Sequence, residues 1–299
     1  MSEPLPKKVP SNAQTILFMI ILSFACALIL SILASLLEEP KEIAKELDRS
    51  KQLMIAAKML DHEGYFLVQD KEGKYVSAKY QEGKLIPAES PEMATKEQLL
   101  DIYNKRIVPL LVNKEGNIKT FQEANINYND YLTKYRKNGY YKESLMLIYK
   151  IVPATAVEEN KDADPEGYVI PVNGFGLWDA IYGYIAIKPD GNTVMGISWY
   201  DQKETPGLGA NISEAYWQNL FPGKRVFQAS ADGKTDFKTA PLGITVVKGK
   251  VAEVLGNSPK ANSAVDGMAG ATLTGNGVIE AYRDVLAPYR PFLIKLQQK

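Results

Sequence analysis

An uncharged apolar run near the N-terminus limits most strongly what this chain can fold into. Residues 15–37 read TILFMIILSFACALILSILASLL, which is 23 residues without a charged side chain. A helix of that length spans the hydrocarbon core of a bilayer, which needs about 20 apolar residues. The run is too long for the apolar core of a cleavable signal peptide, and no small-residue cleavage site follows it cleanly. We therefore predict a short tail over residues 1–14, one transmembrane helix over 15–37 and a folded region after it.

The charges beside this span do not decide its orientation. Two lysines precede it, and four basic residues follow it among many acidic ones. A simple count of positive charges places the following domain in the cytoplasm, but the rule weakens when a long domain follows the span. The residues alone favour an external domain only slightly. Cys26 lies inside the apolar run, and we interpret it as a small buried residue of the anchor and not as a lipid attachment site.

The composition excludes several classes of function. The chain has 299 residues, 35 basic against 35 acidic side chains, one cysteine and one histidine, His62. A balanced charge argues against a nucleic-acid partner. One cysteine cannot ligate an iron–sulfur cluster, and one histidine without neighbouring cysteines makes a zinc site improbable. No Ser-His-Asp or Cys-His pattern is visible around His62. The sequence therefore predicts no catalytic residues and no metal ligands, so any redox chemistry requires a bound organic cofactor.

Strand and helix patterns interleave irregularly after the anchor. Residues 38–62 show an amphipathic helical pattern, which we interpret as a helix linking the anchor to a domain over residues 63–299. A helix is expected over residues 96–110, ending near Pro109, and a helix over residues 211–221, capped by Asn211. The clearest hairpin has strands 177–187 and 193–200 about the turn KPDGN. Without a regular βαβ period the pattern predicts an α+β fold.

The most informative segment is Val265–Gly277, which reads VDGMAGATLTGNG. Thr272 and Thr274 are two hydroxyls among residues with almost no side chain, so another group can approach the backbone closely. A helical apolar pattern follows, and we expect a helix to begin near Gly277. A loop that leads into a helix N-terminus favours a phosphate, because free N–H groups and the helix dipole point toward it. The alternative is a glycine-rich turn in which Thr274 or Asn276 caps the helix.

Two further glycine-rich segments precede this one. Residues 204–209 read ETPGLG, in which Pro206 fixes one φ and the two glycines leave backbone N–H groups open beside Leu208. Such a loop could lie against a flat ring, or it could be a plain turn between the hairpin and the next helix. Residues 173–178 read NGFGLW, where Trp178 could stack on a planar ligand or pack as an ordinary core aromatic.

Together these segments, in this order and after a single N-terminal span, resemble the FMN-binding domain family of bacterial respiratory complexes. The resemblance is to the C subunits of sodium-translocating NADH:quinone reductases, and it covers the anchor and most of residues 168–286. The G subunits of Rnf-type electron-transport complexes share the same features, but the long region before residue 165 favours the quinone reductase. One residue departs from the family pattern, because Ala269 stands where the family usually has Ser or Thr.

The resemblance implies a site for covalently bound FMN. Its phosphate would be esterified to the Thr272 hydroxyl. The implied contacts of the cofactor are with the rest of the two loops and with the tryptophan: Gly270, Ala271, Leu273, Thr274, Glu204, Thr205, Gly207, Leu208, Gly209 and Trp178. Because the hydroxyl missing at Ala269 is not the attachment point, we expect weaker hydrogen bonding in the loop and not a loss of modification.

The resemblance also implies an electron-relay subunit of a sodium-pumping NADH:quinone oxidoreductase. Electrons would pass from an iron centre to FMN and then to a flavin of another subunit. The implied partners are the A, B, D, E and F subunits, membrane lipid and, during maturation, a flavin transferase. The implied location is the bacterial inner membrane, with the domain on the periplasmic side. Two alternatives remain open, a G subunit of an Rnf-type complex and a membrane-anchored scaffold domain without a cofactor.

Overall fold

The computed structural model of the chain describes residues 11–70, 72–154 and 163–298. The chain divides into two units, Met1–Asp48 and Arg49–Lys299. Most of the predicted tail, residues 1–10, lies outside the described residues. Helix α2, Glu38–Ala56, crosses the division between the units.

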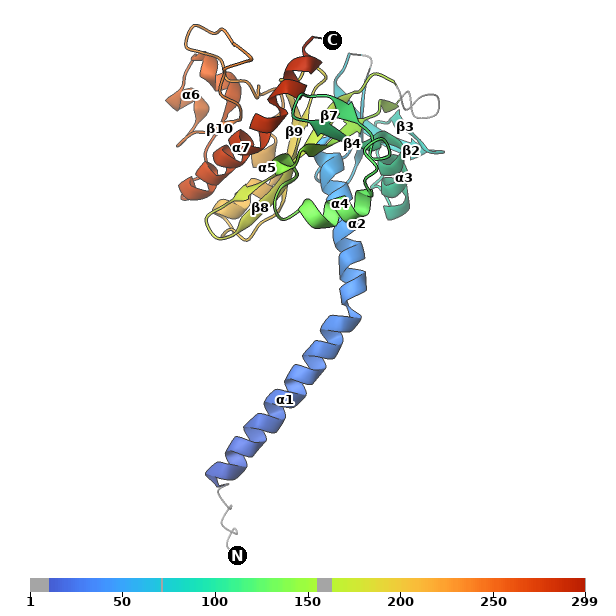
Figure 1. The fold of residues 1–299 in the computed structure, drawn as a ribbon, viewed down its shortest axis with the longest axis vertical. Helices are drawn as coiled ribbons and strands as arrows, with labels where there is room; N and C mark the ends of the chain where they lie inside the picture. The colour runs from blue at the N-terminus through green and yellow to red at the C-terminus, as the bar shows by residue number, and fades with distance from the viewer. Residues whose placement is uncertain (1–10, 71, 155–162, 299) are drawn as a thin grey trace, which may run out of the picture. The chain divides into compact units, whose positions relative to one another are not determined.

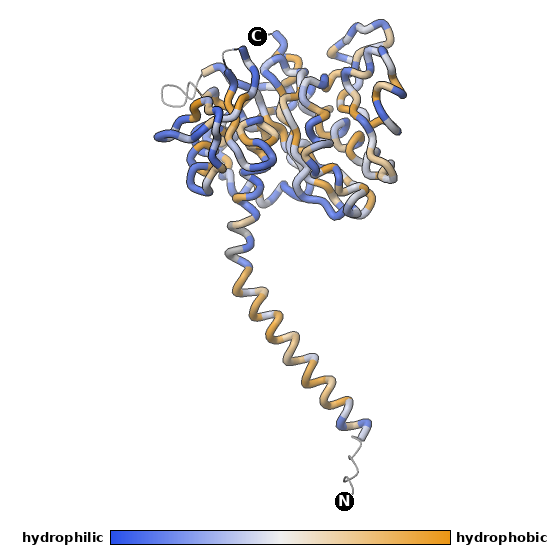
Figure 2. The backbone as a smooth tube through the Cα atoms, turned by 180° about the vertical axis from the view of Figure 1, so that it is seen from behind, coloured by the Kyte–Doolittle hydropathy of each residue, from blue (hydrophilic) through white to orange (hydrophobic). Residues whose placement is uncertain are grey.

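Helix α1 of the first unit covers Asn12–Leu36. It begins at a capping box in which the Ser11 hydroxyl accepts from the backbone of Gln14 and the Gln14 side chain accepts from the backbone of Ser11. Apolar residues occupy all sides of the helix (Figure 2). Its described side chains are exposed. A helix that is apolar all round needs an apolar environment. By length and composition α1 could therefore span a membrane.

A six-stranded antiparallel sheet forms the centre of the second unit, with the strand order β5-β4-β6-β7-β8-β9 (Figure 1). Its strands are β4 Ile107–Asn113, β5 Ile118–Lys119, β6 Leu145–Ile151, β7 Gly167–Phe175, β8 Ala180–Ile187 and β9 Val194–Asp201. The turn at residues 188–192 joins β8 to β9, as the sequence predicted, because Asp190 accepts hydrogen bonds from the backbone of Asn192 and Thr193.

The remaining strands and helices of the second unit lie outside this sheet. Strands β1 Phe66–Gln69, β2 Tyr75–Gln81 and β3 Lys84–Pro87 form a three-stranded antiparallel sheet, and β10 Thr245–Val246 pairs with β11 Ala264–Val265 in parallel. The helices are α3 Lys96–Arg106, α4 Tyr128–Tyr135, α5 Ala215–Gln218, α6 Val251–Val254 and α7 Thr272–Leu296, with short 3₁₀ turns at Tyr140–Lys142 (η1), Gly209–Ser213 (η3) and Pro259–Ser263 (η4). This mixed arrangement confirms the predicted α+β class.

The central sheet has a separate apolar cluster on each face, because successive side chains of a strand point to opposite sides. Along β7, Tyr168, Ile170 and Val172 belong to one cluster and Val169 belongs to the other. The first cluster contains the buried stripe of α7, including Val278, Tyr282 and Val285. The second contains residues of β1, β2 and the end of α2, where residues 53–56 are buried. The second unit therefore includes the end of α2, which packs into its core.

Two predicted elements differ in the structure, and one strand was not predicted. The helix expected over residues 96–110 ends at Arg106, and Pro109 lies inside β4 where it pairs with Tyr149. The helix expected over residues 211–221 is the turn η3 followed by the short α5, and the Asn211 side chain donates to the Gly207 carbonyl instead of capping a helix. Strand β7 was missed, because its continuous apolar sequence is followed at once by the glycine-rich segment around Phe175.

The C-terminal helix starts earlier than the sequence predicted. It begins at Thr272 and not near Gly277, with Ala271 as the N-cap residue, so neither Thr274 nor Asn276 caps it. Gly277 lies in the second turn of α7, where an added Cβ would collide with the backbone oxygen of Phe175. This close approach places the start of α7 directly against the end of β7.

Candidate functional site

The three glycine-rich segments meet at the N-terminus of α7. NGFGLW spans the end of β7, ETPGLG follows the end of β9, and GATLTG leads into the first turn of α7. Strands β7 and β9 are both antiparallel to β8, which lies between them. Their C-terminal ends therefore lie at the same end of the sheet. Gly270 has φ +73, and a Cβ there would lie 2.9 Å from Leu208 Cδ2, which shows that the ETPGLG and GATLTG loops touch.

A single carboxylate joins the three segments. Glu204 is 5% exposed. Its Oε1 accepts from the backbone N–H of Trp178 at 3.0 Å, and its Oε2 accepts from that of Leu177 at 3.1 Å. Oε2 also accepts from the hydroxyl of Thr274, which is 1% exposed. Position 209 requires a glycine, because a Cβ atom there would lie too close to this pair, at 2.7 Å from Glu204 Oε2.

Glu204 is held in its charged form by these hydrogen bonds. Burial by itself raises the pKa of its carboxyl, but the Thr274 hydroxyl and the backbone N–H groups of Trp178 and Leu177 outweigh that effect and hold the pKa below its usual value. Both carboxylate oxygens are occupied within the protein. Its side chain therefore holds the three loops together.

Thr272 has a different setting from Thr274. It is the first residue of α7 and its side chain is exposed. The N-cap residue, Ala271, has no side-chain oxygen that could accept from the first N–H groups of the helix. Those N–H groups have no acceptor inside the helix, and they carry the positive end of the helix dipole. An anion attached to the Thr272 hydroxyl would meet these donors.

A small cavity of about 20 Å³ lies beside Thr272. Asn276 and Lys248 also line it, together with small residues that include Gly267 and Gly275. This volume accommodates a group about the size of a water molecule. Lys248 could not be recognised from the sequence as part of this lining, because it lies 24 positions before Thr272, in the segment after β10. Strand β11 ends two residues before Gly267, and its pairing with β10 brings Lys248 to the cavity.

The outer surface of the loops carries exposed apolar side chains. Trp178 is 68% exposed, and its indole Nε1–H donates to the Thr205 hydroxyl at 3.2 Å. Leu208 and Leu273 are exposed as well. Gly207 has φ +75 and open space around it, so the backbone of the ETPGLG loop is accessible. A flat ring could therefore lie on this surface with apolar groups and backbone donors beneath it.

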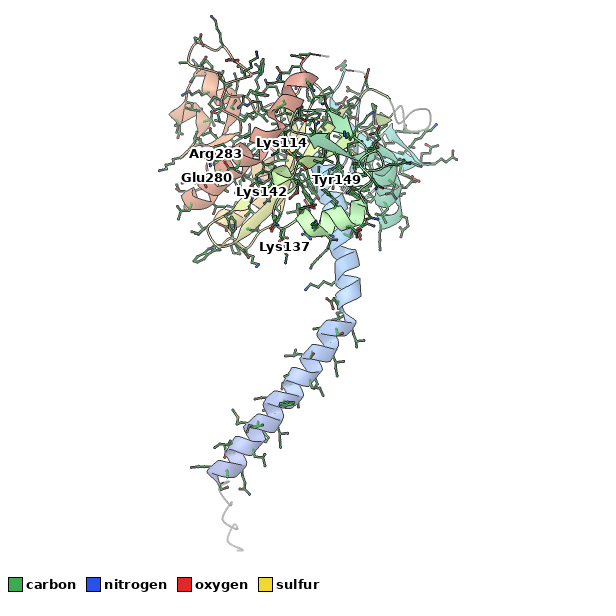
Figure 3. The ribbon with its side chains drawn as sticks, viewed as in Figure 1. Lys114, Lys137, Lys142, Tyr149, Glu280 and Arg283 are labelled. Atoms are coloured by element: carbon green, nitrogen blue, oxygen red, sulfur yellow. The ribbon has the colours of Figure 1, made fainter. Side chains whose placement is uncertain are left out.

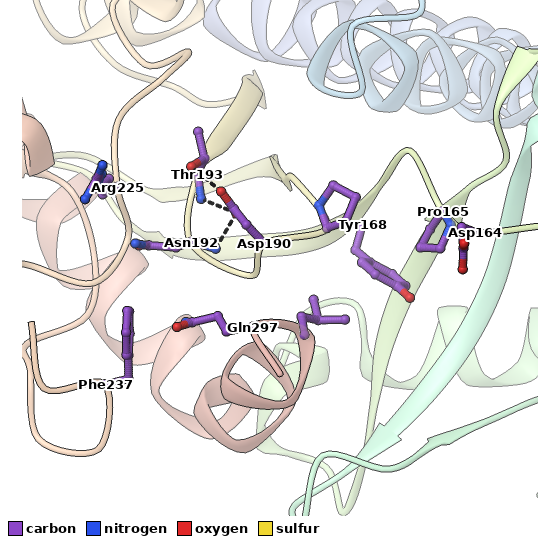
Figure 4. A pocket seen from close by; sticks show the side chains of 11 residues that line it. Asp164, Pro165, Tyr168, Asp190, Asn192, Thr193, Arg225, Phe237 and Gln297 are labelled. Atoms are coloured by element: carbon purple, nitrogen blue, oxygen red, sulfur yellow. Dashed lines mark hydrogen bonds between the residues drawn. The ribbon is translucent and has the colours of Figure 1, made fainter. Parts of the chain in front are cut away.

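A larger cavity of about 690 Å³ lies elsewhere in the second unit. Figure 4 shows Asp190, Asn192 and Thr193 of the β8–β9 turn opposite Gln297, at the C-terminal end of α7. Helix α7 is 25 residues long, so its two ends are about 37 Å apart. None of the predicted site residues lines this cavity, and the candidate site is the loop junction at the other end of α7.

Comparison with known proteins identifies the class of domain to which this loop junction belongs. The model of the FMN-binding domain family matches residues 176–287, which include ETPGLG, GATLTG and Trp178. The chain therefore carries an FMN-binding domain. The uncapped start of α7 with its exposed hydroxyl fits the phosphate of such a cofactor.

The full-length relatives identify the family. The C subunit of the Na(+)-translocating NADH-quinone reductase of Chlamydia caviae is 41% identical over 100% of this chain and 98% of its own length. The C subunit of the Chlamydia muridarum enzyme is 40% identical, covering 93% of this chain and 90% of its own. This chain belongs to the family of C subunits of the Na(+)-translocating NADH-quinone reductase, a multi-subunit oxidoreductase.

A solved structure shares the fold. The crystal structure of the C subunit of a Na(+)-translocating NADH-quinone reductase from Parabacteroides distasonis aligns with a TM-score of 0.51 at 23% identity, over 85% of this chain and 96% of that chain. The membership of the chain in the C-subunit family decides against the Rnf-type G subunit, and the FMN-binding domain argues against a scaffold without a cofactor.

Proposed function

We propose that this protein carries FMN as a phosphoester on Thr272 and relays electrons within a Na(+)-translocating NADH-quinone reductase. The observation that carries this proposal is the position of Thr272, an exposed hydroxyl on the first residue of an uncapped helix. FMN, when bound, supplies reversible electron transfer. The chain's own residues attach, orient and shield it.

The phosphate end would be held by the start of α7. The open N–H groups of the first turn and the helix dipole favour its negative charge. Lys248 and Asn276, which share the small cavity with Thr272, supply a cation and a side-chain amide on the same side. Gly270 and Ala271 leave the approach to the hydroxyl free of large side chains.

The ring would lie on the surface formed by the ETPGLG loop and Trp178. Thr205, Gly207 and Gly209 present backbone groups or a hydroxyl to the ring edge, and Leu208 excludes water from one face. Leu273 and the backbone of Glu204 border the same surface. Glu204 and Thr274 hold the loops beneath it, because their side chains bond each other in the interior.

The covalent linkage is tested on the denatured protein. Chain produced in cells that contain a flavin transferase is unfolded and separated on a gel, which removes any cofactor that is bound only by non-covalent contacts. We expect flavin fluorescence in the protein band. A dark band from such cells would contradict the proposal.

Replacing Leu208 with Glu should lower the reduction potential of the flavin. The new carboxylate would stand beside a ring that gains negative charge on reduction, and like charges disfavour each other more strongly where water is scarce. FMN should stay attached because Thr272 is unchanged. Redox titration of Leu208→Glu against Leu208→Gln separates the charge from the lost apolar contact. Equal potentials in the two variants and in the unmodified protein would mean that the loop is only a structural turn.

The domain should lie on the periplasmic side of the inner membrane, with α1 as a single span in lipid. This proposal rests on the family, since the charges around residues 15–37 do not decide the orientation. A protease added to intact spheroplasts should digest the domain. Digestion only in inside-out vesicles would reverse the assignment.

The relay requires other subunits that deliver and accept electrons. We place an iron centre within the membrane subunits before this FMN and a flavin of the B subunit after it, with the A, D, E and F subunits completing the complex. Trapping the chain with a cross-linker in intact membranes and identifying the linked subunits tests this order. Cross-links to subunits of an unrelated complex would overturn it.

A further inference from the structure

A second hydrogen bond joins the loops of the candidate site, apart from the one between Glu204 and Thr274. The indole Nε1–H of Trp217 donates to the backbone oxygen of Asp266 at 3.0 Å. Trp217 lies in α5 and is 1% exposed. Asp266 directly follows β11 and precedes Thr272 by six positions. The bond therefore connects the segment that follows ETPGLG to the segment that carries Thr272.

Residues 204–218 form one hydrogen-bonded body, which we call the ring segment. Backbone N–H groups donate to backbone oxygens in consecutive turns, at 3.0–3.2 Å, from Ala210 to Thr205, Asn211 to Leu208, Glu214 to Asn211 and Trp217 to Glu214. The side-chain amide of Gln218 also donates to the backbone oxygens of Ile212 and Trp199, at 3.0 and 3.4 Å. The ETPGLG loop and the indole of Trp217 are therefore held in a fixed relation to each other and to β9.

Residues 266–274, which we call the attachment segment, are anchored at their start by hydrogen bonds. Asp266 Oδ1 accepts from the N–H of Val251, the first residue of α6, at 2.7 Å. The N–H of Gly267 donates at 2.9 Å to a backbone oxygen two residues before α6. Trp217 bonds the attachment segment at this same point, where the course of the chain toward α7 is set.

We propose that Trp217 is a positioning residue, which sets the attachment segment against the ring segment so that the flavin linked to Thr272 lies on the ETPGLG loop. This rests on the proposed function. The segments are joined at both ends, at one by Glu204 with Thr274 and at the other by Trp217 with Asp266. Two bonds fix a relative orientation that one bond leaves free to turn. Without the indole N–H the segments should separate at that end about fivefold more often, which is the effect of losing one neutral hydrogen bond.

Trp217→Phe removes this bond, and Trp199→Phe is the matched control. Trp199 is also 1% exposed in the same apolar cluster, but its indole N–H bonds neither segment. In the flavin-loaded full chain we expect unchanged flavin content in both variants. Only Trp217→Phe should show lower fluorescence anisotropy of the flavin and stronger quenching by iodide, because its ring leaves the loop more often. In the flavin-free full chain, amide hydrogen exchange of residues 266–271 should be about fivefold faster in Trp217→Phe and unchanged in the control.

A third variant separates the hydrogen bond from the packing of the ring. The indole of Trp217 is replaced by a benzothiophene, which has nearly the same shape and carries sulfur in place of the N–H, and it should behave as Trp217→Phe does. A benzothiophene variant that behaves as the unmodified protein overturns the proposal. Equal effects of Trp217→Phe and Trp199→Phe also overturn it, because lost packing then moves the loops, and so does the absence of any effect in Trp217→Phe. If the unmodified protein carries no covalent flavin but hydrogen exchange responds as expected, the proposed function fails and the link between the two segments stands.

Discussion

Thr272→Ala is expected to abolish covalent flavin completely. The substitution removes the only atom through which the proposed phosphoester forms, and it leaves the fold unchanged because the side chain is exposed at the first position of α7. Alanine is also a good helix former, so the helix start is retained. Mass spectrometry of the peptide and fluorescence of the denatured band measure the result. Complex assembled with this variant should lose NADH:quinone activity.

Two companion variants accompany this test, and the residue on which mass spectrometry finds FMN decides which threonine carries the cofactor. Thr272→Ser keeps a hydroxyl at the same place and should retain part of the flavin. Thr274→Ser should retain all of it, because Thr274 is buried and its hydroxyl is committed to Glu204. FMN found on residue 274 with Thr272 unmodified would refute the assignment.

The parts of the fold that the sequence could predict are those determined by local pattern. The apolar run of α1, the KPDGN turn and the buried stripe of α7 at Val278, Tyr282 and Val285 are each determined by residues close in sequence. The missed parts depend on distant contacts. Pro109 lies inside β4, which pairs with β6. The residue opposite Pro109 is 40 positions further along the chain, so a local pattern cannot reveal this pairing. Strand β7 is identified by its pairing with β6 and β8 and not by alternation.

The site shows the same division. The sequence pointed to three loops, but it did not predict that the Glu204 carboxyl turns inward to bond Thr274. Lys248 could not be found from sequence, because its place beside Thr272 depends on the short pairing of β10 with β11. The helix start was set too late, because Thr272 and Leu273 carry no capping signal and Ala271 replaces the usual polar N-cap residue.

Glu204→Gln should destabilise the second unit by about 1–3 kcal/mol, and Glu204→Ala by about 3–5 kcal/mol. The amide of glutamine keeps one acceptor oxygen, but its NH₂ group replaces Oε2. That group is a donor and would face the two donors that now bond Oε2, the Leu177 N–H and the Thr274 hydroxyl. Alanine leaves all three buried donors without an acceptor. For a unit of this size each kcal/mol lowers the thermal midpoint by about 2–4 °C. Both variants should also lower flavin occupancy, because the three loops are no longer held together.

The pH dependence identifies the charge as the cause. A carboxyl whose pKa is lowered in the folded state stabilises that state above its ordinary value of 4.5, and the contribution is lost as the pH falls through the lower folded pKa. The gap in thermal midpoint between Glu204→Gln and the unmodified protein should therefore be full at pH 7 and shrink below about pH 4.5. Glu280→Gln is the control, since Glu280 is exposed on α7 (Figure 3), and it should change stability by less than about 0.5 kcal/mol. If Glu204→Gln is as stable as this control at pH 7, the carboxylate does not hold the three loops together.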